Sequence, residues 1–230
     1  MKLCEQTIKI LENFRDINNG IVIKPGNKLR TISVNKAVLA EAIVEESFPL
    51  EVGIYDLGKV LDILKIHSYQ EIDFKESFIS VGDPGSRGKT RVRYSDPKLI
   101  LVPPNKEINI AAFDASLKLS EEDLLWIEKV GSILKCPYVV FECDRSKITI
   151  SAADVKGEIT DDSSLLIADV ENTPAFKYVF KVENLKLLPG TYEIQLADRG
   201  LAKFSHTSLN VHYWVAIEKN TSNIETKESN

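Results

Sequence analysis

The sequence predicts an α+β protein made of two copies of one plan. Two segments carry apolar residues at helical spacing, and several shorter segments alternate apolar and polar residues as strands do. Matching landmarks recur in the same order, 118 to 125 residues apart. Each half of the chain is therefore predicted to contain a helix, several strands, a short helix and several more strands.

The first helix of each half is predicted from an apolar stripe on one side of a segment that is polar on the other. These segments are 4–17 and 120–135, and the second begins with Ser120-Glu121-Glu122-Asp123, which resembles a capping box. The predicted apolar sides are Ile10, Leu11, Phe14 and Ile17 in the first helix and Trp126, Ile127, Val130, Ile133 and Leu134 in the second.

The strands of the two halves also match. The pair Ile32-Ser33 aligns with Ile150-Ser151 at an offset of 118 residues. Further along, an apolar strand runs directly into a short helix in each half, and an alternating hairpin follows it. The aligned pairs at the short helix are Tyr55 with Phe180, Leu57 with Val182 and Val60 with Leu185, and the inward hairpin residues are Ile72 and Phe74 in one half and Tyr192, Ile194 and Leu196 in the other.

Prolines mark the connection between the halves. Pro97, Pro103 and Pro104 punctuate an extended stretch that fits neither repeat. We therefore predict a first domain at 1–102, a connector at 103–113 and a second domain at 114–219. The polar end of the chain, 220–230, is predicted to be a disordered tail.

Composition describes a soluble globular chain. Of its 230 residues, 43% are hydrophobic and 27% are charged, and no apolar run is long enough to span a membrane. The chain starts with a mixed-charge segment and not with a signal peptide. A net charge of −5 argues against bulk non-specific nucleic-acid binding but leaves room for a local basic surface. Three cysteines without metal-ligand spacing fit a reducing cytosolic setting.

One stretch resembles a phosphate-binding loop. The run from Asp83 to Thr90 ends in Gly-Lys-Thr, as a P-loop does. However, Asp83 occupies the position of the first glycine, and the residues after Thr90 alternate as a strand does, where a P-loop requires a helix. The stretch is therefore predicted to be a hairpin turn built on Pro84, Gly85 and Gly88, and no ATP site is expected.

Catalytic motifs are absent from the sequence. No histidine or cysteine spacing predicts a metal site, and no Gly-x-Ser-x-Gly elbow predicts a hydrolase. The adjacent carboxylates of Asp161 and Asp162 diverge on a strand or turn, so they do not form an acid/base couple. We expect no metal, no cofactor and no catalysis, although groups from distant positions can still converge on a site.

In the order of its motifs, the chain resembles the sliding clamps of T-even-type bacteriophages. These are ring-shaped processivity factors of DNA polymerase. They share the clamp fold of proliferating cell nuclear antigen. The resemblance covers almost the whole chain, and the middle hairpins, especially the segment from Ser77 to Tyr94, depart from the family pattern. The residues that carry it are Asn13-Phe14, Ile17-Asn18, Gly53-Ile54-Tyr55-Asp56-Leu57, Ile63-Leu64-Lys65, Pro104-Asn105-Lys106, Glu122-Asp123-Leu124, Pro189-Gly190 and Tyr192.

The resemblance implies a fold and a mechanism. Each half would be a clamp domain with two helices packed on antiparallel sheets, and three chains would close head to tail into a ring. Duplex DNA would pass through the ring without sequence readout. The expected partners are DNA polymerase, an ATP-dependent clamp loader and late-transcription factors, in the cytoplasm of an infected bacterial host.

The resemblance also implies that helices line the hole. The basic residues on or beside the predicted helices would then face DNA, among several acidic neighbours. Alternatively, these side chains are ordinary solvated helix charges. The candidates are Lys2, Lys9, Arg15, Lys59, Lys65, Lys129, Lys135, Lys181 and Lys186.

Subunit contacts are expected between a basic edge strand and an acidic one. In the family, the strand before the connector pairs with the second domain of a neighbouring subunit, and opposite charges would set the register. Alternatively, the edge charges only prevent aggregation. The candidates are Arg87, Lys89, Arg91, Val92, Arg93 and Tyr94 on the basic side and Glu158, Asp161, Asp162, Leu165 and Ile167 on the acidic side.

Clamp families bind partner peptides in an apolar pocket under the connector. The candidates here are Ile108, Ile110 and Phe113 on the connector and Val215 and Ile217 on the last strand, although alternating apolar residues also occur in ordinary cores. Two other functions remain open: a monomeric polymerase accessory or scaffold protein of the same fold, and an enzyme whose site has no sequence signature.

Overall fold

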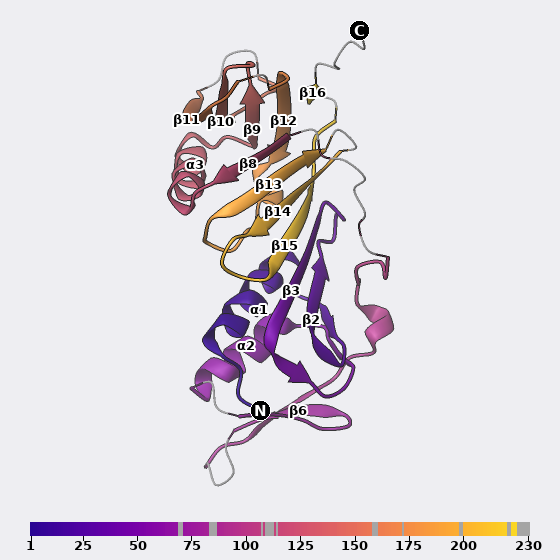
Figure 1. Ribbon diagram of the computed structural model, residues 1–230. Coiled ribbons are helices and arrows are strands. Elements are labelled where there is room, and N and C mark those ends of the chain that lie inside the picture. Colours follow the sequence, from indigo (N-terminus) through magenta and orange to yellow (C-terminus); the bar gives the residue numbers. More distant parts are fainter. Residues whose placement is uncertain are drawn as a thin grey trace. The chain divides into compact units, whose positions relative to one another are not determined.

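The computed structural model describes residues 1–68, 71–82, 87–106, 108, 113, 115–157, 161–171, 173–197, 200–219 and 222–224. The chain divides into two compact units, Met1–Glu107 and Ile108–Asn230 (Figure 1). Both units combine helices with antiparallel sheets, so the predicted α+β class is confirmed. We describe each unit by itself.

The first unit contains two α-helices and seven strands among its described residues. Strand β1 pairs with β4, β2 pairs with β3, and β5, β6 and β7 form a sheet in that order. Its elements are α1 (Glu5–Ile17), β1 (Ile21–Ile23), β2 (Gly26–Ile32), β3 (Val38–Phe48), β4 (Val52–Ile54), α2 (Leu57–Ile66), β5 (Ile72–Phe74), β6 (Phe78–Val81), β7 (Thr90–Arg93) and the 3-10 helix η1 (Pro97–Leu99).

The second unit repeats these pairings. Strand β9 pairs with β12, β10 pairs with β11, and β13, β14 and β15 are neighbours in that order, which confirms the duplicated plan. Its elements are β8 (Ala115–Leu119), α3 (Glu121–Leu134), β9 (Tyr138–Cys143), β10 (Lys147–Ala153), β11 (Ser163–Asp169), β12 (Phe176–Lys181), the 3-10 helix η2 (Val182–Asn184), β13 (Tyr192–Ala197), β14 (Leu201–His206), β15 (Val211–Ala216) and β16 (Asn223–Ile224).

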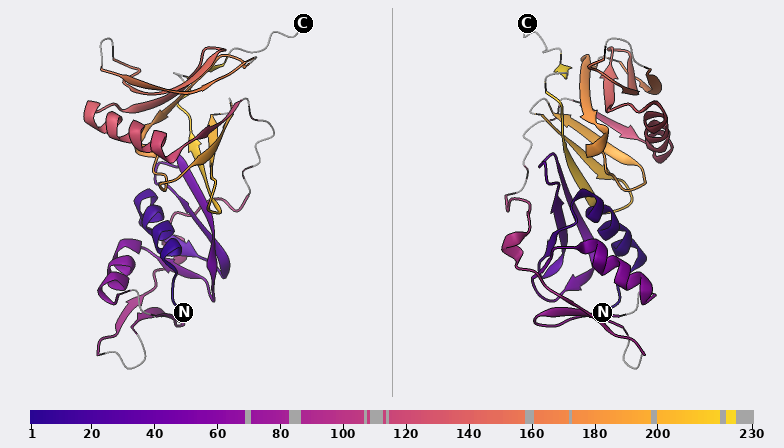
Figure 2. Two further views of the ribbon diagram at one scale, coloured as in Figure 1. Left: turned by 60° about the vertical axis from the view of Figure 1, so that its left-hand side comes forward. Right: turned by 180° about the vertical axis from the view of Figure 1, so that it is seen from behind.

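Helices α1 and α2 lie side by side on one face of the strands of the first unit (Figures 1 and 2). The predicted stripe of α1 is buried in full, because Ile10, Leu11, Phe14 and Ile17 all point into the core. The sulfur of Cys4 accepts a hydrogen bond from the backbone N–H of Thr7 and caps the helix start. Helix α2 buries four apolar residues in the same core: Leu57, Val60, Leu61 and Leu64.

Helix α3 packs against β9, β10 and β11 (Figure 2), and its buried face agrees with the predicted one only in part. Of the predicted side, Ile127 is buried, and Trp126, Val130 and Leu134 are half-buried. Leu124, Ile127 and Gly131 are buried, whereas Ile133 is 77% exposed. Six residues separate Ile127 from Ile133, which at 3.6 residues per turn places them on different sides of the helix. The prediction that Ile133 belongs to the core side is therefore wrong.

The second predicted short helix is only one turn. Val182–Asn184 form the 3-10 helix η2, which has no side-chain cap, whereas Asp56 caps the ten-residue α2. Pro189 follows η2 within a few residues and limits any extension of a helix. The two domains are therefore less alike in their helices than in their strands.

The hairpin at the P-loop-like stretch is confirmed where the structure describes it. Val81 lies opposite Thr90 in the antiparallel pair of β6 and β7, so Thr90 begins a strand and not a helix. Residues 83–86 of the turn lie outside the described residues. At the other end of the chain, Asn223–Ile224, expected within a disordered tail, form β16 against Phe176 and Lys177.

Candidate nucleic-acid and subunit interfaces

The outward side of α1 and α2 is the largest helical surface of the first unit. Because the apolar sides of both helices are buried, their polar sides face solvent. Lys9, Lys59 and Lys65 are exposed there, and Arg15 is half-buried at the margin. This surface is the one that a nucleic acid would meet on the helical side of the unit.

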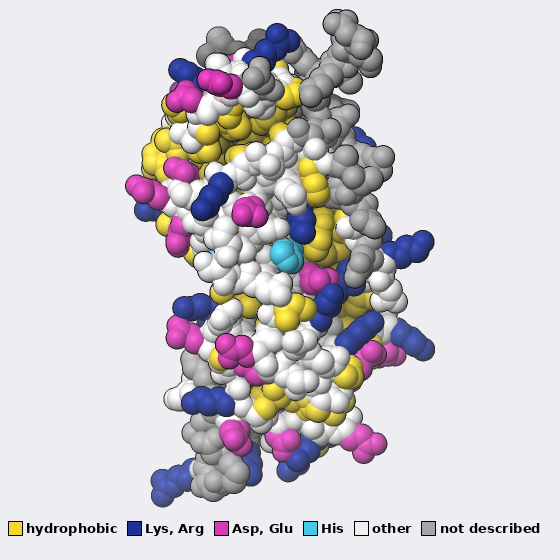
Figure 3. Space-filling view, viewed as in Figure 1, with side chains coloured by type: hydrophobic (Ala, Val, Ile, Leu, Met, Phe, Trp, Pro, Cys, Tyr) yellow, Lys and Arg dark blue, Asp and Glu magenta, His cyan; other side chains and the backbone are white. Residues whose placement is uncertain are grey.

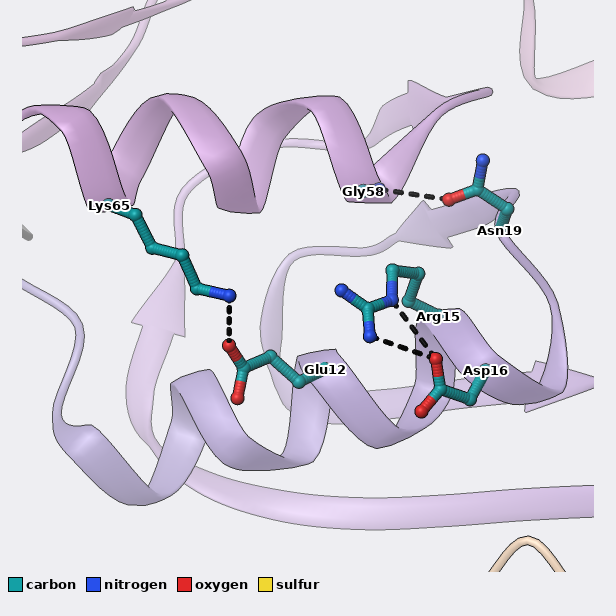
Figure 4. Close-up of polar contacts among 6 residues, drawn as sticks. All are labelled: Glu12, Arg15, Asp16, Asn19, Gly58 and Lys65. Carbon is teal, nitrogen blue, oxygen red and sulfur yellow. Dashed lines mark hydrogen bonds and ion pairs between the residues drawn. The ribbon is translucent and has the colours of Figure 1, made fainter.

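The two helices are tied together at one end (Figure 4). The side-chain oxygen of Asn19 accepts a hydrogen bond from the N–H of Gly58 at 2.9 Å, and the Asn19 amide nitrogen donates to Asp56 at 3.0 Å. Asp56 also accepts from the N–H of Lys59 at 3.0 Å. The end of α1 is therefore held at the start of α2, and the helices run antiparallel.

Ion pairs cover this surface. Lys65 at the end of α2 lies 3.0 Å from Glu12 of α1, which joins the two helices through their side chains (Figure 4). The guanidinium of Arg15 lies 2.9 Å from Asp16, also on α1. Positive charges in the last turn of each helix are favourable because of the helix dipole.

A third ion pair lies nearer the start of α1. Lys9 and Glu5 are 2.8 Å apart at i,i+4 spacing. Their hydrogen bond lowers the pKa of Glu5 and raises the pKa of Lys9, so both stay charged over a wide pH range. Beside them is a surface hollow of about 480 Å³, lined by Lys2, Leu3, Glu5, Ile8, Lys9, Glu12 and Ser68.

The predicted basic residues of the second unit are more scattered. Lys181 ends β12 and lies 3.8 Å from both Glu183 and Glu218. The first turn of α3 carries Glu121, Glu122 and Asp123, so this helix begins acidic. On the face shown in Figure 3, basic and acidic side chains are likewise interspersed. The remaining predicted cations are all exposed: Lys129, Lys135 and Lys186.

Strand β7 is a basic sheet edge. Among the described residues it pairs only with β6, so its other side is open. The side chains alternate: Arg91 and Arg93 are exposed, whereas Val92 and Tyr94 are half-buried on the other face. Arg91 lies over the ring of Phe78 at 5.1 Å, which holds the guanidinium against the strand. Arg87 and Lys89 are exposed just before the strand.

Tyr94 is unusual within this edge. Burial, with the nearby carboxylate of Asp73, raises the pKa of its phenol, and its hydroxyl has no hydrogen-bond partner among the described residues. A hydroxyl in such a place normally finds a partner.

Strand β11 is the matching edge of the second unit. In the described part of the chain it pairs only with β10, and a bulge at Ile167 interrupts the ladder. Asp161 and Asp162 are exposed immediately before the strand, and Leu165 and Ile167 are half-buried. The sequence analysis did not single out Leu166, which is 50% exposed. Glu158 lies outside the described residues.

The acidic residues at this edge affect the pKa of a neighbouring thiol. Cys136, just after α3, is buried, and its sulfur lies 3.7 Å from the backbone oxygen of Asp161. Burial raises the pKa of the Cys136 thiol, and the negative charges of Asp161, Asp162 and Asp154 raise it further. The local field at the start of β11 is therefore negative.

The predicted peptide pocket is only partly accessible in the described residues. Val215 is fully buried and Ile217 is 7% exposed, so both belong to the core of the second unit. Ile108 and Phe113 are half-buried, and Ile110 lies outside the described residues.

The structure shows a hollow at the start of the connector that the sequence analysis did not find. It has a volume of about 270 Å³. Arg30 donates a hydrogen bond to the backbone oxygen of Pro104 at 3.0 Å, and Lys24 approaches the Asn105 side chain at 3.5 Å. The alternation of β2 was readable in the sequence, but its contact with the connector was not. The lining residues are Val22, Lys24, Pro25, Lys28, Arg30, Val102, Pro103 and Asn105.

The described part of the chain has neither a metal-binding cluster nor a membrane-spanning helix. It contains no group of three or more His, Cys, Asp or Glu side chains that could hold a metal ion. No helix among the same residues is long and apolar enough to cross a membrane.

Two family models match the chain. Residues 4–86 match the family described as DNA polymerase processivity factor, and residues 116–219 match the C-terminal part of the gp45 sliding clamp. Each match lies within one of the two units.

Curated relatives match over nearly the full length. The chain is 32% identical over 223 residues to the sliding clamp of Vibrio phage KVP40, covering 95% of this chain and 99% of the relative. It is 30% identical over 229 residues to the sliding clamp of Enterobacteria phage T4, covering 95% and 97%.

Solved structures with similar folds are proliferating cell nuclear antigens. The protein from Entamoeba histolytica has a TM-score of 0.68 and 15% identity, covering 92% of this chain and 94% of that one. The A. fulgidus protein, solved with the C-terminal region of FEN-1, has a TM-score of 0.69 and 17% identity, covering 98% of each chain. This likeness confirms the clamp fold.

Proposed function

Because the chain belongs to the phage sliding-clamp family of DNA polymerase processivity factors, we propose that three copies close head to tail into a ring around duplex DNA. Residues 1–102 and 114–219 act as clamp domains joined by the connector 103–113. The ring performs no reaction. It tethers the polymerase to its template in the cytoplasm of the infected host, after an ATP-dependent loader has placed it there.

The observation that carries this proposal is the pair of open sheet edges of opposite charge. Strand β7 with its exposed Arg91 and Arg93 belongs to the first unit, and β11 with Asp161 and Asp162 before it belongs to the second. A basic edge in one unit and an acidic edge in the other can join successive copies head to tail, and such contacts form a ring if the rotation closes. Main-chain hydrogen bonds between the two edges would extend both sheets.

The helical surface of the first unit suits the hole of such a ring. It is polar, it carries cations at several positions, and most of these cations have an acidic neighbour. A ring that must slide needs weak phosphate contacts, because each neutralised phosphate adds strongly to the salt-dependent affinity. The helix cations at Lys9, Lys59 and Lys65 therefore serve to centre the duplex and not to fix it.

Partners would dock at the connector. The FEN-1 region bound by a clamp of the same fold is a C-terminal segment of its protein. We place a corresponding peptide site of this chain at the start of the connector, in the hollow beside Val102 and Pro103. The polymerase, the loader and late-transcription factors would use this site.

The ring is tested by reversing the basic edge. The variant R91E/R93E should shift the mass in light scattering from three times the 25.8 kDa of one chain to that of a single chain. The matched control K36E/K98E makes the same charge change at exposed positions outside β7 and should keep the ring. Adding D161R/D162R to R91E/R93E should restore it. An unchanged mass in R91E/R93E would contradict the proposal.

Encircling of DNA is tested separately. The protein is threaded onto a linear duplex that carries biotin at both ends, and streptavidin is then added to block the ends. A ring should remain on the duplex through a high-salt wash and leave when a restriction enzyme opens one end. A monomeric accessory protein would wash off both the blocked and the cut duplex.

A further inference from the structure

Resting on the proposed function, the geometry points to Glu12 as a residue that limits the grip of the clamp on DNA: its carboxylate holds Lys65 and competes with backbone phosphates for that cation. Lys65 and Glu12 are 3.0 Å apart and come from different helices. The pair lies on the polar side of α1 and α2, which is the side proposed to face the duplex (Figure 4).

The surroundings of Glu12 support this role. Its side chain is 30% exposed and that of Lys65 is 45% exposed, so a phosphate can reach the pair without a rearrangement of the backbone. Glu12 also lines the hollow that contains Lys2, Lys9 and Glu5. The hydrogen bond and charge of Glu5 are the main causes that raise the pKa of Lys9, and the charge of Glu12 adds to them. One carboxylate therefore acts on two of the cations proposed to face DNA.

Competition follows from the chemistry of the lysine. A lysine ammonium is a compact point charge that binds either a carboxylate or a phosphate oxygen. An exposed ion pair is weak, so a phosphate can replace Glu12, but the carboxylate must be displaced each time. This exchange lowers the net binding free energy gained from each phosphate contact. Weaker contacts favour rapid sliding over tight binding.

Asp62 provides a control on the same surface. It is exposed on α2, one turn before Lys65, and makes no ion pair with any described residue. Removing its charge changes the general field near DNA as much as removing the charge of Glu12 does. Only the Glu12 change removes the ion pair with Lys65.

The experiment measures binding of the full-length protein to a fluorescein-labelled linear duplex by anisotropy, at salt concentrations from 50 to 200 mM. E12Q should steepen the slope of log affinity against log salt by roughly 0.9 for each phosphate newly neutralised. Between 200 and 50 mM salt, the affinity of E12Q should therefore gain about 3.5-fold more than that of the wild type for each added contact.

Three further variants decide the cause. D62N should tighten binding only because one negative charge near the DNA is removed. Its slope of log affinity against log salt should equal that of the wild type. E12Q/K65Q should return to the wild-type slope or below it, because the released cation is gone. E12D keeps the charge but withdraws the carboxylate by one methylene, so it should steepen the slope without a change in net charge. Thermal melts show whether each variant keeps the fold.

The outcomes separate the two proposals. Equal slopes for E12Q, D62N and the wild type would overturn the role of Glu12 while leaving the ring intact, provided that the wild type stays on the end-blocked duplex. Loss of the wild type from that duplex would overturn the proposed function itself. A steeper slope in E12Q that persists in E12Q/K65Q would also contradict the inference, since the effect would not need Lys65.

Discussion

Tyr192 is expected to stabilise the second unit through one buried hydroxyl. The hydroxyl donates a hydrogen bond to the backbone oxygen of Leu188 at 2.6 Å, and the N–H of Leu188 donates to the hydroxyl of Tyr213 at 3.3 Å. Both tyrosine side chains are fully buried. The change Tyr192→Phe keeps the aromatic side chain but removes its hydroxyl, which leaves the backbone oxygen of Leu188 without its hydrogen-bond donor. Because a buried unsatisfied group is costly, we expect a loss of about 1–3 kcal/mol at pH 7.

The same residue gives a prediction for alkaline pH. Burial raises the pKa of both Tyr192 and Tyr213 above the value of about 10 found in unfolded chains. Below pH 10 both tyrosines are neutral in the folded and unfolded states. Above it only the unfolded state loses protons, so each tyrosine lowers the free energy of unfolding by about 1.4 kcal/mol per pH unit. Above pH 10, the free energy of unfolding of Tyr192→Phe should therefore fall less steeply with pH than that of the wild type, by about 1.4 kcal/mol per pH unit.

The assay is urea unfolding followed by tryptophan fluorescence at fixed protein concentration. The only two tryptophans of the chain, Trp126 and Trp214, belong to the second unit, so their emission reports on this unit. Tyr55→Phe is the matched control, because Tyr55 is 63% exposed and its substitution should leave unfolding at pH 7 unchanged. The reasoning is refuted if Tyr192→Phe loses less than about 0.5 kcal/mol at pH 7 and declines in parallel with the wild type from pH 10 to 11.

Two further perturbations follow from local geometry. Gly190 has a φ of +148°, and a Cβ there would lie 2.1 Å from Nε2 of His206. Gly190→Ala should cost about 1–3 kcal/mol, or roughly 2–4 °C of melting temperature per kcal/mol. The double variant with His206→Ala should recover part of the loss, and full tolerance of Gly190→Ala alone would contradict the clash. Asp56→Ala removes the cap of α2 and should cost about 0.5–2 kcal/mol at pH 7. The hydrogen bond from the backbone of Lys59, aided by the Asn19 amide, lowers the pKa of Asp56. Its contribution should therefore be present above about pH 4 and disappear as the pH falls through the folded pKa. Thermal melts of Asp56→Ala and the wild type at pH 7 and 2.5 measure this contribution. An equal loss of stability in Asp56→Ala at both pH values would contradict the role of the charged carboxylate.

The strands and the first helix were readable from the sequence because burial there follows a simple period. Tyr192, Ile194 and Leu196 alternate along β13 and are all buried, as predicted. The stripe of α1 repeats at helical spacing and is also buried, including Phe14 and Ile17. In both cases one face meets the core and the other meets solvent, so the pattern of apolar residues carries the information.

Helix α3 shows where this reasoning fails. Its buried face includes Gly131, whose Cα lies so near β10 that an added Cβ would be 3.4 Å from the Cβ of Ala152. Glycine has no hydrophobic signal, whereas Ile133 has a strong one but faces solvent. The apolar pattern therefore located Ile127 correctly but extended the predicted buried side to Ile133 and missed Gly131. Close backbone packing at a small residue cannot be recognised from periodicity alone.

The candidate surfaces were predictable in part. The alternation of charges along β7 located Arg91 and Arg93 on one exposed side, and the structure has them there. The pairing of Lys65 with Glu12 was not predictable, because it depends on how α2 lies against α1, 53 residues apart in the sequence. The sequence identified which cations lie on the helices but not which carboxylates hold them.

The unequal helices of the two units have a consequence for the symmetry that DNA would experience. The strand pairings repeat, but a ten-residue helix in one unit is replaced by a single turn in the other. In a closed ring of three copies, six domains would surround the duplex. Around the hole, domains with the long second helix would alternate with domains that have only a single turn in its place. Turning the duplex by one domain would then change its surroundings, and only a turn of 120° would restore them.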